Sequence, residues 1–228
     1  MSAVSVEAST ASILEAGPGA SPRTALQRLR VKPLPFRVVK TIVVRHHYLH
    51  SMPGGTQLAF GVFEGKLLVG ALTLGVGPKH AYRLVEGARP DACITLTRFW
   101  LSDELPANAA SRVMGVVMRA LRRNTELGFV VTYADPAHGH VGTIYQATGW
   151  VYTGLSQPTG LLDLGDGVPR HTRSVGHAFG THSIKHFAAC GVPIRVISQE
   201  PKYRYVYFIN PVLRDRLRVP AESYPRST

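Results

Sequence analysis

The chain has 228 residues, 45% of them hydrophobic, which is enough for one domain with a sizeable core, and no run of about 18 apolar residues predicts a membrane-spanning segment. A formal net charge of +12 and an isoelectric point near 10.2 favour a polyanionic partner such as nucleic acid over a basic protein with no such partner. The two cysteines, Cys93 and Cys190, lie far apart without CxxC spacing, which excludes a disulfide framework and a zinc knuckle and fits a reducing cytoplasm.

The N-terminal residues 1–24 are small and polar and show no hydrophobic periodicity, so we expect a disordered tail there. This stretch lacks the charged start and apolar core of a secretion signal. A single domain is expected over 25–215, followed by a C-terminal tail over 216–228.

Residues 36–50 are predicted to form a helix, because apolar residues and histidines recur at steps of three and four. The residues on this face are Phe36, Val39, Val43, His47 and His50. The "SMPGGT" that follows ends the helix. Next, "QLAFGVFEGKLLVGALTLG" has a turn at Glu64-Gly65 between two apolar runs, which predicts a β-hairpin.

A strand is predicted at 93–101 ("CITLTRFWL"), and a helix at 109–124 follows it with Asn108 as the N-cap. The run "FVVTYAD" at 129–135 is continuous and rich in β-branched residues, as in a strand whose two faces are both covered.

The stretch "YADPAHGHVGTIYQATGW" continues with a short helix, which places on one face Val141, Ile144, Tyr145 and Thr148. Gly149 is expected to end that helix with a positive φ, and a strand follows at 150–155. A Gly-, Pro- and His-rich segment at about 156–185 predicts a loop-rich insertion, and 202–209 predicts the last strand. This order of elements indicates an α/β (α+β) fold with a mixed sheet covered by helices.

The sequence "IYQATGW" resembles the signature of the GNAT acyltransferase superfamily, in which a tyrosine of this helix lies beside the donor thioester. The resemblance covers about 30–210 and implies a GNAT-like, mostly antiparallel central sheet flanked by helices. The superfamily also has a glycine-containing loop that binds the donor pyrophosphate. Here the corresponding "LPANAASRVMG" has no glycine before the helix, which leaves open whether the helix start, Ser111 and Arg112 bind an acyl-CoA-type donor.

Three longer blocks, "HHYLHSMPGGTQLAFGVFEGKLLVGALTLG", "LTRFWLSDELPANAASRVMG" and "YADPAHGHVGTIYQATGWVYTG", together resemble the Mom family of phage DNA-modification proteins. The resemblance implies an enzyme that converts adenine N6 in double-stranded DNA to a carbamoylmethyl-type adduct, which protects the DNA from host restriction. It also implies action in the host cytoplasm, and it is compatible with a bound iron ion and with a homodimer.

The candidate catalytic residues are, with the help of this resemblance, His47, Tyr48, Asp135 and Tyr145. A carboxylate that closes a buried strand must be hydrogen-bonded, capping or catalytic. Each residue also has a structural interpretation, as a packed core histidine, an N-cap or a packing tyrosine.

Imidazole and carboxylate groups with open coordination positions also suit non-haem Fe(II). The candidate ligands are His47, Tyr48 and Asp135, with His50 as an alternative, and the loop histidines His138 and His140 are further alternatives.

Arg98 lies inside a strand, where an arginine binds an anion of the donor or the DNA or else forms a structural salt bridge. The segment 170–186 is either a DNA-facing loop or a solvated surface loop, with basic residues Arg170, Arg173 and Lys185. An enzyme that acts on a paired adenine is expected to flip the base, which could stack on Trp100, Tyr133 or Trp150.

Two other functions stay open at this point. One is an acetyl-CoA-dependent N-acetyltransferase of a small amine or protein. The glycine-free loop and the basic charge are evidence against this function. The other is a non-catalytic DNA-binding protein on a GNAT scaffold, because a fold does not determine a function.

Overall fold

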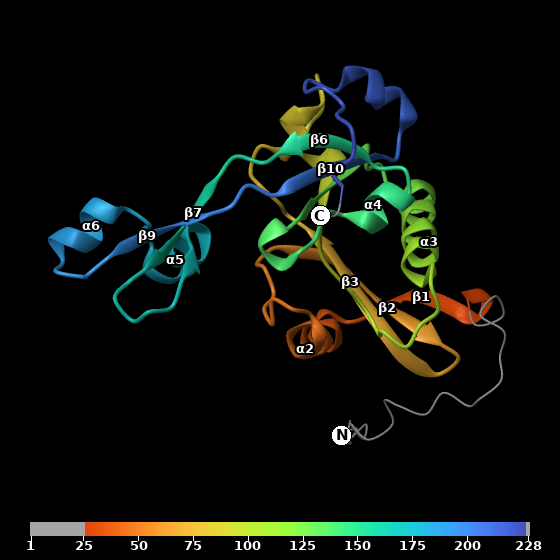
Figure 1. Ribbon diagram of the computed structural model, residues 1–228, viewed down its shortest axis with the longest axis horizontal. Helices are drawn as coiled ribbons and strands as arrows, with labels where there is room; N and C mark the ends of the chain where they lie inside the picture. Colours follow the sequence, from red (N-terminus) through yellow and green to blue (C-terminus); the bar gives the residue numbers. More distant parts are fainter. Residues whose placement is uncertain (1–25, 227–228) are drawn as a thin grey trace, which may run out of the picture.

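The computed structural model describes residues 26–226, so the tail expected at 1–24 lies outside the described residues. A seven-stranded sheet forms the body of the protein in the order β1-β2-β3-β4-β5-β10-β6 (Figure 1). These strands are β1 (Leu29–Pro33), β2 (Thr56–Glu64), β3 (Leu67–Gly75), β4 (Cys93–Leu101), β5 (Phe129–Ala134), β6 (Val151–Leu155) and β10 (Tyr203–Phe208). Neighbouring strands are antiparallel except for β4 and β5, which confirms the predicted mixed, mostly antiparallel fold class.

Two helices, α2 (Phe36–His46) and α3 (Ala109–Asn124), cover opposite faces of this sheet. Ala71 of β3 packs against α2, whereas the next residue, Leu72, belongs to the core that α3 covers. Successive strand residues point to opposite faces, so the two helices lie on either side. The short helix α4 (Thr143–Ala147) packs on the α3 side through Ile144 and Tyr145.

Short 3₁₀ turns complete the body at Ala81–Leu84, Pro90–Ala92, Pro136–His138 and Pro211–Arg216. Residues 217–226, expected to be part of a tail, lie against β6 and α4. The Tyr224 hydroxyl donates to the Trp150 carbonyl at 2.8 Å, and the Gln146 amide donates to the Pro225 carbonyl at 3.2 Å. Among the helices of residues 26–226, none has the length and apolar composition needed to cross a membrane.

The first predicted helix was expected to run to residue 50, and this is wrong, because α2 ends at His46. His47 adopts an extended conformation, and its Nδ1 accepts a hydrogen bond from the Leu49 N–H at 3.1 Å. This side-chain contact satisfies a backbone donor that a continued helix would have paired with a carbonyl. His50, at φ 44°, is exposed, so a His-x-x-His pair on one helix face does not exist.

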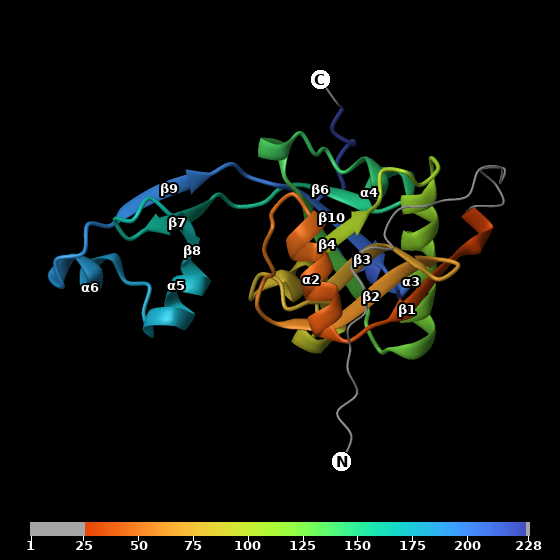
Figure 2. The ribbon, with the colours of Figure 1, turned by 90° about the horizontal axis from the view of Figure 1, so that it is seen from below.

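The segment after β6 differs from the loop-rich insertion expected at about 156–185. Residues 156–202, called the arm below, project from the body on two chain segments (Figures 1 and 2). The arm contains β7 (Thr159–Asp163), β8 (Arg170–His171), α5 (Thr172–Phe179), α6 (Ile184–Ala189) and β9 (Arg195–Gln199). Its strands form a separate three-stranded sheet, and Leu162, Val175 and Phe187 form its own small core.

Gly142, which begins α4, is expected to tolerate no side chain. Its φ is 80°, and an added Cβ would overlap the Tyr205 ring. Gly142→Ala should therefore lower the free energy of unfolding by about 2 to 4 kcal/mol in a urea titration. Gly149→Ala is the control, because Gly149 has a similar φ of 74° but open space around it, so its loss should be only about 1 kcal/mol. Equal losses would contradict the steric argument.

Candidate active site

The site begins where β4 and β5 separate. The two parallel strands pair over only three residues, and the last pair is Thr95 with Val131. Beyond it the strands diverge and leave an opening through the sheet. A pocket of about 280 Å³ fills this opening, with Leu96 to Phe99 of β4 on one side and Thr132 to Ala134 of β5 on the other.

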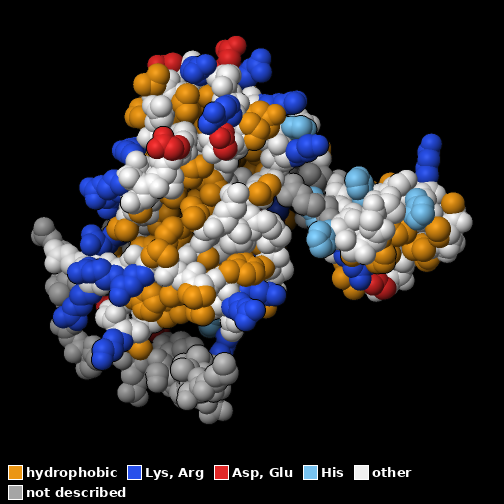
Figure 3. Space-filling view, turned by 180° about the vertical axis from the view of Figure 1, so that it is seen from behind, with side chains coloured by type: hydrophobic (Ala, Val, Ile, Leu, Met, Phe, Trp, Pro, Cys, Tyr) orange, Lys and Arg blue, Asp and Glu red, His pale blue; other side chains and the backbone are white. Residues whose placement is uncertain are grey.

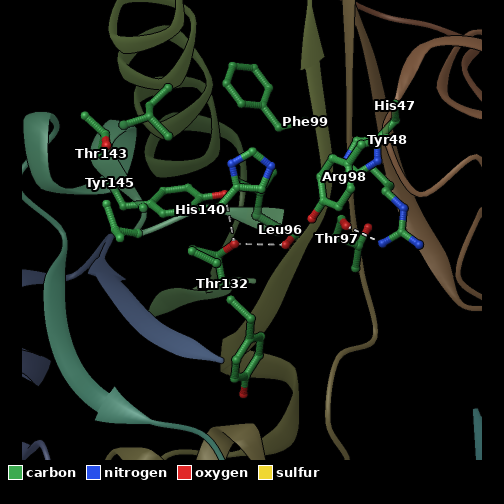
Figure 4. Close-up of a pocket in the computed structure, with 16 residues that line it drawn as sticks. His47, Tyr48, Leu96, Thr97, Arg98, Phe99, Thr132, His140, Thr143 and Tyr145 are labelled. Atoms are coloured by element: carbon green, nitrogen blue, oxygen red, sulfur yellow. Dashed lines mark hydrogen bonds between the residues drawn. The ribbon is translucent and has the colours of Figure 1, made fainter. Parts of the chain in front are cut away.

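Both faces of the sheet contribute further residues to this pocket (Figure 4). His47 and Tyr48 enter from the end of α2, and Thr143, Ile144 and Tyr145 enter from α4 on the opposite face. The loop between β5 and α4 adds His140. The structure thus brings His47, Tyr48, Arg98 and Tyr145, which the sequence singled out, into one pocket.

His47 is buried and neutral. Burial, followed by the charge of Arg98 and the nearby histidines, lowers the pKa of His47 to about 4. Because Nδ1 accepts the Leu49 N–H, the neutral ring carries its proton on Nε2. In this arrangement the Nε2 of His47 is a hydrogen-bond donor and not a proton acceptor.

Tyr48 lies at the centre of a ring cluster at the pocket. Its ring stacks on His47 at 4.3 Å between centroids and lies 4.6 Å from His138 and 4.9 Å from His140. Burial and the charge of Asp135 both raise the pKa of Tyr48, so the phenol keeps its proton at neutral pH. His138 and His140, the loop histidines that the sequence offered as alternative metal ligands, therefore belong to the same cluster.

Tyr145 is joined to both diverging strands through Thr132. The Thr132 hydroxyl lies 3.2 Å from the Leu96 carbonyl and 3.3 Å from the Tyr145 hydroxyl, and its single proton serves one of them at a time. Burial raises the pKa of Tyr145 to about 12, so the phenol remains a proton donor. When Thr132 donates to Tyr145, the phenol proton stays available to a molecule in the pocket.

Arg98 contributes a positive charge that is not neutralised by a carboxylate in the described part of the chain. Its Nε donates to the Ser51 carbonyl at 2.9 Å and its Nη1 to the Thr97 carbonyl at 2.7 Å. The bond to Ser51 holds the loop after α2 against β4. The remaining positive charge makes the pocket suitable for an anionic group.

Asp135 is buried next to the pocket and does not line it. Its Oδ1 accepts the Ala137 N–H at 3.1 Å, and its Oδ2 pairs with the Lys202 ammonium at 2.6 Å. Asp135 therefore caps the following turn, as its structural interpretation predicted, and it also forms an ion pair. Lys202 is the partner that the sequence did not reveal, because it becomes adjacent only through the antiparallel pairing of β10 with β5.

Three other sequence candidates lie away from the pocket. Ser111 and Arg112 are half-buried in the first turn of α3 and do not line it, so their assignment to a donor stays a prediction. Trp150 is completely buried beside Tyr145 and is not accessible to a flipped base. Of the other stacking candidates, Tyr133 lines the pocket and Trp100 stacks on His46 at 4.4 Å.

The residues expected to bind iron do not fit a metal in this arrangement. A metal at Nε2 of His47 needs the opposite tautomer, with the proton on Nδ1, but that nitrogen accepts the Leu49 N–H. The Asp135 carboxylate is already neutralised by Lys202. Within residues 26–226, no group of three or more His, Cys, Asp or Glu side chains is arranged to hold a metal ion.

Thr132 was also missed as a site residue. It lies inside the continuous apolar strand "FVVTYA", and this one polar residue in a buried run was a usable signal. A buried hydroxyl needs a partner, and here its partners are the groups that face the pocket.

These observations define a mixed α/β protein with a cationic pocket between two diverging parallel strands. Comparison with known sequences then shows that the chain belongs to the Mom protein family, which matches residues 28–226. The chain is 28% identical over 212 residues to methylcarbamoylase mom of Escherichia phage Mu. The matched region covers 88% of this chain and 85% of that protein. The family resemblance seen in the sequence is thereby confirmed.

Several solved structures are similar to this chain. RimL, a ribosomal L7/L12 α-N-protein acetyltransferase, has a TM-score of 0.45 and 9% identity, over 80% of this chain and 94% of that one. FeeM, an N-acyl amino acid synthase from uncultured soil microbes, has a TM-score of 0.46 and 14% identity, over 84% of this chain and 96% of that one.

The burial of neutral His47 predicts a pH-dependent stability. The unfolded chain binds a proton at His47 near pH 6.5 and the folded chain near pH 4, so the unfolded state binds more protons between these values. The contribution of His47 to the free energy of unfolding is therefore complete above pH 6.5 and falls as the pH decreases toward 4. Urea unfolding should show that His47→Gln removes about 2 kcal/mol of the stability difference between pH 7.5 and pH 5.

The control for this prediction is His80→Gln, which changes an exposed histidine that is not among the groups lowering the pKa of His47. This variant should keep the pH dependence of the wild type. An unchanged pH dependence in His47→Gln would contradict the burial argument.

The Lys202–Asp135 pair gives a second prediction. Lys202→Met leaves the Asp135 carboxylate buried without its counter-charge and should cost about 2 to 3 kcal/mol in urea unfolding. Adding Asp135→Asn should recover part of this loss, and Lys202→Arg should lose less than Lys202→Met. Additive losses in the double variant would show that the two residues are not coupled.

Proposed function

We propose that this protein is a DNA-modifying transferase that acts on the N6 amine of adenine in double-stranded DNA and leaves a carbamoylmethyl-type adduct. Membership of the Mom family and the name of the phage Mu relative support this proposal. The observation that carries it is the meeting of His47, Tyr48, Arg98 and Tyr145 in one pocket that passes between two strands. The adduct would protect the modified DNA from restriction enzymes.

The pocket has the size and polarity that this reaction needs. Its volume of about 280 Å³ lies just below the usual range for ligand sites, roughly 300–1,000 Å³, and suits one extruded base or the reactive end of a donor. Tyr48 lines the pocket and is 40% exposed, so part of its side chain can contact such a base while its ring stacks on His47. Arg98 offers a positive charge to an anionic part of the donor or of the DNA.

The groups in the pocket divide into proton donors and one proton acceptor. Attack by N6 on the activated carbon of a donor forms the new C–N bond, breaks the bond from that carbon to the leaving group, and releases a proton from the amine. His140 lines the pocket, and we assign its imidazole the role of accepting this proton. Tyr145 is protonated at neutral pH and donates a proton to the leaving group. His47 donates a hydrogen bond from its Nε2 to the molecule bound in the pocket. No step is assigned to iron, since its expected ligands do not fit.

Tyr145→Phe should abolish modification without unfolding the protein. Loss of a general acid lowers a rate by about 10²- to 10⁴-fold, whereas the ring that packs against Trp150 and Tyr205 is kept. Mass spectrometry of nucleosides from a plasmid co-expressed with each variant measures the heavier deoxyadenosine. Tyr207→Phe, which removes a hydroxyl from a tyrosine outside the pocket, is the control and should keep full modification.

The same assay separates the competing functions. Wild-type protein that binds duplex DNA but yields no heavier deoxyadenosine would be a non-catalytic DNA-binding protein. An acetylated amine formed from acetyl-CoA, with unmodified DNA, would indicate an ordinary N-acetyltransferase. Full modification by Tyr145→Phe would refute the role of Tyr145 as the acid.

A further inference from the structure

The solvent-facing side of α2 carries an unneutralised positive charge. Val39 and Val43 are buried against the sheet, and the opposite side of the helix exposes Arg37, Lys40 and Arg45. No Asp or Glu occurs anywhere from Val31 to Phe63. None of the ion pairs within residues 26–226 involves this helix.

This cationic face leads directly to the pocket. Arg45 comes two residues before His47 and three before Tyr48, both of which line the pocket. A polyanion that lies along α2 therefore reaches the mouth of the pocket at the C-terminal end of the helix. The pocket itself adds the charge of Arg98 at that end.

The spacing of the charges fits a nucleic-acid backbone. Arg37 and Arg45 are eight residues apart, which corresponds to roughly 12 Å along a helix that rises 1.5 Å per residue. Phosphates of one DNA strand succeed each other at about 3.4 Å along the duplex axis, so this face covers about three or four of them.

The arm is a poorer phosphate-binding surface at its paired arginines, although Arg170, Arg173 and Lys185 made it a candidate from the sequence. Arg170 bonds to Asp166 at 2.7 Å, and Arg195 bonds to Asp163 at 3.0 Å. Figure 3 shows Lys and Arg side chains gathered mainly on the body, whereas His side chains gather on the arm. Because these two arginines already pair with carboxylates within the arm, they are less available to an external anion.

We infer that the exposed face of α2, formed by Arg37, Lys40 and Arg45, binds the phosphate backbone of the duplex whose base enters the pocket. This inference rests on the proposed function and adds the surface that positions the DNA. Phosphate contacts give affinity and orientation without reading sequence, so this face fixes the duplex relative to His47 and Tyr48.

A matched pair of double variants tests the inference. Arg37→Gln/Arg45→Gln removes two exposed arginines from α2, and Arg119→Gln/Arg123→Gln removes two from α3, on the opposite face of the sheet. The net charge changes equally in both, and Gln maintains helix propensity. Fluorescence anisotropy with a labelled duplex is measured over a series of salt concentrations, together with KM and kcat for adenine modification.

The α2 double variant should bind duplex DNA about tenfold more weakly, and its salt slope should fall by about 1.8, or about 0.9 for each lost phosphate contact. Its KM should rise while kcat is kept. The α3 double variant should change affinity by less than about twofold, the level expected where no phosphate contact is lost.

Two results would overturn the inference: unchanged affinity for duplex DNA in the α2 variant, or equal losses in both variants. In each case the proposed function stands if the wild type still modifies adenine. Wild-type protein that neither binds nor modifies duplex DNA would refute the proposed function and this inference together.

Discussion

The early separation of β4 and β5 is the constraint on which the rest of the site depends. A sheet normally isolates its two faces, so side chains from α2 and α4 would never meet. Because pairing stops after Thr95 and Val131, the sheet has an opening at its centre, and residues from both faces reach it. When the Thr132 hydroxyl donates to the Leu96 carbonyl, it links the two diverging strands across the gap.

The same opening determines the electrostatic character of the pocket. Burial keeps His47 neutral and Tyr145 protonated, so these two residues act as donors of hydrogen bonds or protons. The nearby carboxylate, Asp135, is paired with Lys202, and Arg98 keeps its charge. The pocket is therefore positively charged and rich in donors, which suits an anionic or strongly accepting ligand. This excess of positive charge and hydrogen-bond donors also explains why a cation fits poorly among the residues expected to bind one.

The sequence predicted local features well and long-range contacts poorly. The strand at 93–101 and the helix at 109–124 occur at the expected residues, because their signals are hydrophobic periodicity and turn composition. The end of α2 was misplaced, since a bond from the Leu49 N–H to the His47 ring decides it. Lys202 could not be found, because its pairing with Asp135 depends on which strand lies beside β5.

The arm is mechanically joined to the site through this same lysine. At the base of the arm the Ser156 N–H donates to the Lys202 carbonyl at 2.8 Å, and the Lys202 N–H donates to the Ser156 hydroxyl at 3.0 Å. The Lys202 ammonium then holds Asp135, whose carboxylate caps the turn that begins the loop with His138 and His140. A continuous series of contacts thus runs from the base of the arm, through Lys202 and Asp135, to the loop whose two histidines contact Tyr48.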